Sequence, residues 1–175
     1  GWAGWKTYLG RPDTDGARCS SMEVLGKALQ VGPSRPEDAL PVLEAGLDLI
    51  RRYWSQDEDA ILTAQTSLSN CLADLGREDE ALVLKRHIYA RRVTMLGASH
   101  ERTILSGMNV AISLSGLELW DEALPFARDR LLPVAIRSLG LDHNLTLKLN
   151  LIQAQALMTT PERTRDDLCF DAAST

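Results

Sequence analysis

The chain has 175 residues and 45% hydrophobic content, which suits one soluble globular domain or about four stacked pairs of helices. Its net charge of −5 argues against a nucleic-acid-binding protein, because a surface that follows the phosphate backbone needs clustered lysine and arginine. No stretch has the roughly 18 to 20 uninterrupted apolar residues of a membrane span, and no positively charged segment leads into a secretory apolar core, so we expect a soluble chain.

The spacing of apolar residues predicts a chain made of helices. The alternation typical of strands is absent from the sequence. Over residues 81–96 and 104–117 the apolar positions spread over more than one helical face, as expected when a helix packs on its own partner and on the next pair. The predicted helices, in chain order, cover residues 14–31, 37–53, 60–75, 78–96, 102–117, 120–138 and 144–158, with short helical pieces at each terminus.

The residues at the expected helix ends support these ranges. The acidic run that begins at Asp57 precedes the third helix, where carboxylates cap the first turn and favour the positive end of the helix dipole. Gly76, Gly97 and Gly140 each follow a periodic run, as glycine does where a helix stops in the left-handed conformation. Pro133 lies inside the sixth helix, so we expect it to remove one hydrogen bond and bend that helix.

Two phrases recur along the chain at a nearly constant distance. LGASHERT, residues 96–103, returns 43 residues later as LGLDHNLT, residues 139–146, with Leu, Gly, His and Thr at the same places. The Ala-Leu pairs 39–40, 81–82 and 123–124 are 42 residues apart. A fixed period of about 20 to 50 residues is typical of repeat proteins, in which each unit buries its apolar face against its neighbours.

These repeats resemble a known family. LADLGREDEAL, residues 72–82, is similar to the tetratricopeptide (TPR) pattern, and the period near 42 with LGxxHxxT between units resembles the kinesin light chain type. The resemblance covers about residues 9–168 and departs from the pattern at Glu118, which replaces the turn glycine. It implies an all-α, right-handed α-solenoid of stacked antiparallel helix pairs.

From this resemblance we expect a single solenoid domain over residues 1–175. The first residues fall inside a repeat and include no initiator Met, so we expect a processed form or a piece of a longer polypeptide. Partial repeats then lie at both ends. The expected core repeats cover about residues 14–54, 60–97, 102–140 and 144–170.

The resemblance also implies which residues contact a partner, because the first helix of each pair lines the concave face in this family. Such a groove suits an extended or helical segment with apolar anchors, and an amide such as that of Asn109 can bond a ligand's backbone as donor or acceptor. The alternative for Leu105, Met108 and Ile152 is a place in the core between repeats. The matching positions are Thr63, Thr66, Ser67, Asn70, Leu105, Met108, Asn109, Ile112, Lys148, Leu151, Ile152 and Gln155.

A second candidate surface is the aromatic segment at the start of the chain. Trp2, Trp5 and Tyr8 are three of the nine aromatic residues. Tryptophan and tyrosine dominate binding hot spots, and they are also costly to leave exposed to water. Trp2 and Trp5 therefore either bind a partner or cap the open end of the first repeat.

The sequence contains no pattern typical of catalysis or of cofactor binding. Phosphate-binding loops, nucleophile elbows and His-Glu-x-x-His motifs are absent. His100 and His143 recur at equivalent places, but a metal site needs three or four converging ligands, so we favour a structural duty such as bonding loop carbonyls or the start of the next helix. Cys19, Cys71 and Cys169 form neither a disulfide framework nor paired metal ligands, which favours a reducing, intracellular compartment.

Two functions remain in view. The first is a non-catalytic scaffold that binds a protein or peptide segment in its concave groove, without cofactor or metal. The second is a structural subunit docked permanently in a larger assembly through its terminal and convex surfaces. Neither function involves nucleic acid or a membrane span.

Overall fold

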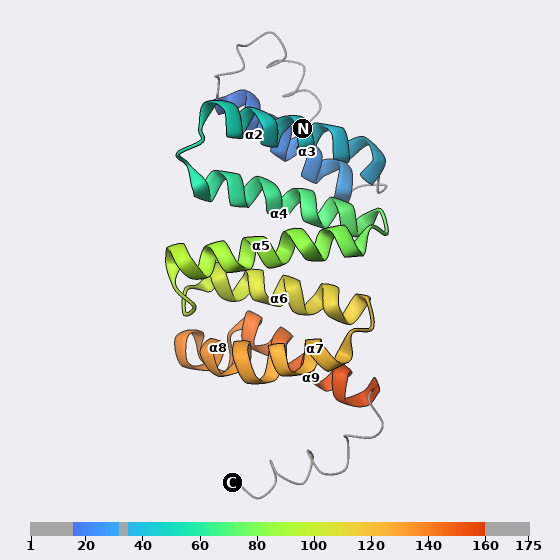
Figure 1. Ribbon diagram of the computed structural model, residues 1–175, viewed down its shortest axis with the longest axis vertical. Helices are drawn as coiled ribbons and strands as arrows, with labels where there is room; N and C mark the ends of the chain where they lie inside the picture. The colour runs from blue at the N-terminus through green and yellow to red at the C-terminus, as the bar shows by residue number, and fades with distance from the viewer. Residues whose placement is uncertain (1–15, 32–34, 160–175) are drawn as a thin grey trace, which may run out of the picture. The chain divides into compact units, whose positions relative to one another are not determined.

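The computed structural model of the protein describes residues 16–31 and 35–159 (Figure 1). All regular elements in this part are helical, which confirms the all-α prediction, and every predicted helix is present to within two residues at each end. The terminal helical pieces that the sequence predicts lie outside the described residues. The elements are α2 (Gly16–Val31), α3 (Pro36–Tyr53), α4 (Glu58–Asp74), α5 (Glu78–Leu96), α6 (Glu101–Gly116), α7 (Trp120–Pro125), the π-helical segment η1 (Phe126–Leu131), α8 (Leu132–Leu139) and α9 (Asn144–Thr159).

The helices pack as consecutive antiparallel neighbours within two compact units (Figure 1). The first unit ends at Leu84 and the second begins at Lys85, inside α5. In the first unit α2 packs on α3 and α4. In the second unit α6 packs on α7, η1 and α9, and α8 packs on α9. The single domain over residues 1–175 stays a prediction.

Apolar side chains from neighbouring helices fill the interior of each unit. In the first unit, buried Leu47 and Ile50 of α3 meet Ala64 of α4, and the half-buried Trp54 packs against them. The large ring of Trp54 therefore contributes apolar area to the contact between α3 and α4. The core of the second unit is drawn from four elements and consists of Ile104, Met108, Ala111, Ala127, Leu131, Ala135, Leu145, Leu149 and Ile152.

The recurring LGxxHxxT phrase ends one helix and begins the next. Gly97 and Gly140 have φ of 83° and 94°, a region in which a side chain is strained. The Nδ1 atom of His100 accepts a hydrogen bond from the backbone N–H of Arg102 at 3.1 Å. His143 repeats this contact with the N–H of Leu145 at 3.3 Å. The two histidines therefore bond free amide groups at helix starts, which is one of the two structural roles that the sequence left open.

The threonine of the phrase bonds the preceding helix end. Thr103 and Thr146 are fully buried. The hydroxyl of Thr103 donates to the carbonyl of Arg92 at 3.3 Å, and that of Thr146 donates to the carbonyl of Gly140 at 2.8 Å. The carbonyl of Gly140 follows the last residue of α8 and has no intrahelical partner, so the bond from Thr146 satisfies it. The bond to Arg92 gives the buried hydroxyl of Thr103 the partner that burial requires.

The sixth predicted helix contains an interruption. Residues Phe126–Leu131 form a π-helical segment, after which the N–H of Leu132 bonds the carbonyl of Ala127, five residues back. Pro125 stands directly before the segment, and Pro133 is the second residue of α8. Proline lacks an N–H and its ring clashes with the carbonyl four residues earlier, so a regular α-helical ladder cannot continue through Pro133. The irregularity at Pro133 takes the form of a π segment, while the predicted bend of the helix stays a prediction.

Cys71 is fully buried between α4 and α3. Its thiol donates a hydrogen bond to the carbonyl of Pro36 at 3.3 Å. Burial, reinforced by the charges of Asp74, Glu44 and Glu37, raises the pKa of the Cys71 thiol above its ordinary value of 9.0. The folded state therefore holds the proton more tightly than the unfolded chain does.

We expect the thiol proton of Cys71 to make the free energy of unfolding decrease as the pH rises in the alkaline range. A raised pKa contributes stability that is present below pH 9 and lost as the pH rises above it, because only the unfolded chain then releases the proton readily. Urea unfolding at pH 7.5, 9 and 10 measures the loss. The same titration of Cys71→Ala should show a smaller loss, and equal pH dependence of the two proteins would contradict the assignment.

Candidate functional site

The candidate partner residues fall into four sets of equivalent positions. Each set takes one residue from α4, one from α6, 42 residues later, and one from α9, a further 43 residues on. Equivalent residues should have similar surroundings in a regular repeat. The sets are Thr63, Leu105 and Lys148; Thr66, Met108 and Leu151; Ser67, Asn109 and Ile152; and Asn70, Ile112 and Gln155.

The structure divides these sets by exposure. The first and fourth sets reach the surface in every helix, with Leu105 37% exposed and Ile112 46% exposed. Met108, from the second set, and Ile152, from the third, are buried in the core of the second unit. Met108 and Ile152 therefore occupy core positions, which was the alternative to partner binding. Leu105, for which the same alternative was open, lies at the surface.

Leu151 is an exception within the second set, because it is 59% exposed where Met108 is buried. Leu147, 43 residues after the fully buried Ile104, is 54% exposed in the same way. Both lie on α9, the last helix of the described part of the chain. Their exposure therefore marks the end of the described stack.

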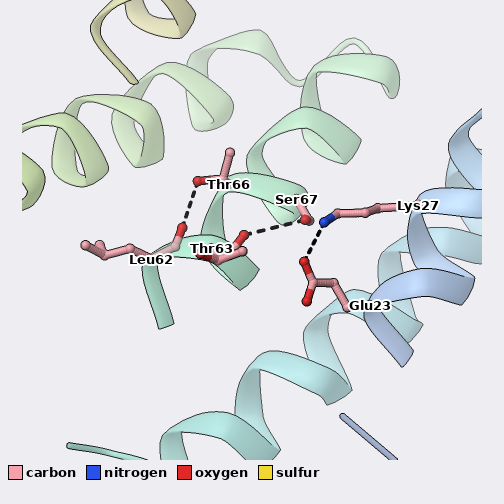
Figure 2. A network of polar contacts seen from close by, with 6 residues as sticks. All are labelled: Glu23, Lys27, Leu62, Thr63, Thr66 and Ser67. Atoms are coloured by element: carbon pink, nitrogen blue, oxygen red, sulfur yellow. Dashed lines mark hydrogen bonds and ion pairs between the residues drawn. The ribbon is translucent and has the colours of Figure 1, made fainter. Parts of the chain in front are cut away.

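Two hydroxyl groups on α4 donate hydrogen bonds to backbone carbonyls of the same helix (Figure 2). Thr66 Oγ1 donates to the carbonyl of Leu62 at 2.7 Å, and Ser67 Oγ donates to the carbonyl of Thr63 at 3.5 Å. Thr66 is half-buried, so its oxygen lone pairs remain available as acceptors for a ligand. Ser67 is buried at 4% exposure, so its hydroxyl is not available at the surface. Asn70 is exposed on the same helix. Its amide supplies both donors and an acceptor, so it can bind a ligand's backbone in either sense.

Sequence reasoning missed a cavity of about 390 Å³ in the second unit. It lies between the part of α5 from Arg86 to Val93, α6 and the segment from α7 into η1. An ion pair crosses its border, in which Arg86 contacts Glu122 at 2.7 Å. Its lining residues are Arg86, Tyr89, Ala90, Val93, Val110, Glu122, Phe126 and Arg130.

The structure bears on the aromatic segment, on metal sites and on membrane spans only through the residues that it describes. Trp2 and Trp5 lie outside them. In residues 16–31 and 35–159 no cluster of three or more His, Cys, Asp or Glu side chains is placed to hold a metal ion. Within the same ranges, no helix is long and apolar enough to cross a membrane.

Solved structures show which fold this arrangement belongs to. A structure of a candidate kinesin light chain from Podosopora anserina with nearly identical TPR-like repeats matches with a TM-score of 0.77 and 17% identity, over 95% of this chain and 78% of that chain. A form of that protein with a single substitution matches with a TM-score of 0.78 and 16% identity over the same shares. The chain has a TPR-like repeat fold. No protein-family model matches the sequence. No curated protein matches it either.

These comparisons establish the fold of the chain. Stacked helix pairs of this kind present an extended surface. At these identities the likeness concerns the fold alone. The partner and the surface that binds it must be argued from this chain's own residues.

Proposed function

We propose that the chain is a non-catalytic scaffold that binds a protein or peptide segment along the first helices of its repeats. The supporting observation is the exposure of the first and fourth sets of equivalent positions on α4, α6 and α9. In the second unit these sets, together with Asn109, form what we call the α6–α9 face. Its residues are Leu105, Asn109, Ile112, Lys148 and Gln155.

The chemistry of this face indicates the kind of segment that it binds. Leu105 and Ile112 are two helical turns apart, roughly 10 Å along the axis at 1.5 Å per residue. Apolar side chains of a ligand match this spacing at positions i and i+3 of an extended segment in the polyproline II conformation, which has three residues per turn, or at positions i and i+7 of a helix. The half-buried amide of Asn109 lies between them and can bond the ligand's backbone.

Peptides selected from a displayed random library on the full chain test this proposal. We expect the selected peptides to carry two apolar residues at one of these spacings. Leu105→Ser combined with Ile112→Ser should weaken their binding about 100-fold, since each buried apolar side chain contributes roughly 1.5 kcal/mol. Isothermal titration calorimetry measures the change.

Leu141→Ser is the matched control, because Leu141 is an exposed leucine in the loop before α9 and does not belong to the α6–α9 face. It should leave binding unchanged. Circular dichroism of each variant establishes that the fold is retained. Selected peptides that bind the double variant as tightly as the original chain would refute the groove assignment.

The rival function, a subunit held permanently in a larger assembly, is favoured by Leu147 and Leu151. These leucines expose apolar surface at positions that are buried in the preceding repeat. A partner docked on these exposed leucines of α9 would be lost on Leu151→Ser and would tolerate the Leu105 and Ile112 changes. The same binding experiment therefore separates the two functions.

A further inference from the structure

The cavity in the second unit has an apolar interior and aromatic walls. Val110, which is buried on α6, lines it together with the half-buried Val93 and the exposed Ala90 of α5. The rings of Tyr89 and Phe126 meet edge to face, with 5.4 Å between their centroids. At about 390 Å³ the cavity has the size of a small-ligand site and accepts an apolar group.

Arg130 lies across the aromatic pair at the border of the cavity. Its guanidinium carbon is 5.7 Å from the centre of the Tyr89 ring and 5.8 Å from that of Phe126. A guanidinium that stacks on rings keeps its N–H donors directed outward in its own plane, where a carboxylate can accept two of them. The stacking therefore orients Arg130 before any ligand arrives.

The charges at the border favour an anion. Arg86 and Glu122 neutralise each other, with both carboxylate oxygens of Glu122 within 2.8 Å of the Arg86 guanidinium. Within the described part of the chain, no carboxylate pairs with Arg130. The lining thus carries one positive charge beyond the ion pair. A ligand cation is disfavoured, because Arg130 already occupies the faces of both rings.

The π-helical segment places two of these groups together. Phe126 and Arg130 are its first and fifth residues, and Glu122 lies one turn earlier on α7. Such segments inside α-helices are frequent at functional sites. None of the lining residues belongs to the α6–α9 face, so the cavity is a separate candidate site.

We propose that this cavity binds an apolar carboxylate, with the apolar body between Tyr89, Phe126 and Val110 and the carboxylate on Arg130. Two sources carry this chemistry: a free organic acid, and the C-terminal residue of a peptide that ends in an apolar side chain. Both place an apolar group and a carboxylate a few bonds apart. The site is independent of the proposed function of the α6–α9 face.

Titration of the full ¹⁵N-labelled chain tests the proposal, with amide chemical shifts as the readout. The probes are 3-phenylpropionate, its amide, and acetyl-Gly-Ser-Gly-Phe as the free acid and as the amide. We expect both acids to shift the amide signals of Ala90, Val93 and Val110. Each amide should bind at least 10-fold more weakly than its acid, and the tighter of the two acids identifies the source.

Two variants report on the two halves of the site. Arg130→Gln should weaken acid binding at least 10-fold, whereas Arg137→Gln, which changes an exposed arginine on α8 outside the cavity, should have no effect. Ala90→Leu fills the cavity and should abolish binding of every probe. A retained spectrum away from the cavity establishes that each variant folds.

The proposal is overturned if acid and amide bind equally, if Arg130→Gln binds the acids unchanged, or if no probe shifts the cavity signals at 10 mM. Shifts confined to Leu105 and Ile112 overturn it as well. That last outcome leaves the α6–α9 face intact as a binding surface, so failure of this proposal is distinguishable from failure of the scaffold function.

Discussion

Leu149→Ala is expected to lower the free energy of unfolding by about 3 kcal/mol. Leu149 is fully buried on α9, in the cluster that also holds Ile104 and Leu131. Removal of its three outer carbons loses their transfer free energy and leaves a cavity that the surrounding helices fill only in part. Urea unfolding followed by circular dichroism measures the change.

Leu151→Ala is the matched control, because the same substitution two residues later falls on an exposed side chain. It should change the free energy of unfolding by less than about 0.5 kcal/mol. Similar losses in the two variants would show that α9 does not pack with Leu149 inward. Leu149→Ala and Leu151→Ala also serve as controls in the binding experiments, because the first removes stability and the second removes only exposed surface.

The helix boundaries could be predicted because the chain marks them with residues of strong local preference. Gly97 and Gly140 follow the last apolar position of a helix and adopt positive φ. Asp57 precedes α4 and accepts a hydrogen bond from the N–H of Ala60 at 2.9 Å. These effects depend on a few neighbouring residues, so one sequence suffices to read them.

Burial at the candidate site could be predicted only in part. The resemblance to the family placed Met108 and Leu105 together on the concave face, yet Met108 lies in the core and Leu105 at the surface. Apolar residues lay on more than one side of α6, so its pattern did not indicate which side neighbouring helices cover. That distinction depends on packing between repeats.

The cavity could not be predicted from the sequence, because it is built on a structural feature that sequence patterns do not reveal. Its border requires the π segment at Phe126–Leu131, and proline at position 133 indicates an interruption without indicating its form. Tyr89 reads in the sequence as one of several packing residues of α5. Only the structure brings it within 5.4 Å of Phe126 and beneath Arg130.

Gly140→Ala is expected to lower the free energy of unfolding by about 2 kcal/mol. Gly140 has φ of 94° and ψ of 167°, a conformation that is essentially restricted to glycine. A Cβ atom added there would meet no atom within 4 Å, so the loss comes from the backbone alone. Thr146 also bonds the Gly140 carbonyl at 2.8 Å, which holds this backbone in place.

Two alanine controls separate backbone strain from the loss of glycine itself. Gly76→Ala, at φ of 75° with open space around it, should cost about 1 kcal/mol, because the left-handed helical region is strained but accessible to other residues. Glu118, a non-glycine residue at φ of 58°, shows that this chain tolerates such a position. Gly116→Ala, at the exposed end of α6, should stabilise the protein by a few tenths of a kcal/mol, since alanine favours helix. If Gly140→Ala behaves like Gly116→Ala in urea unfolding, the recurring Leu-Gly pair does not act through its backbone conformation.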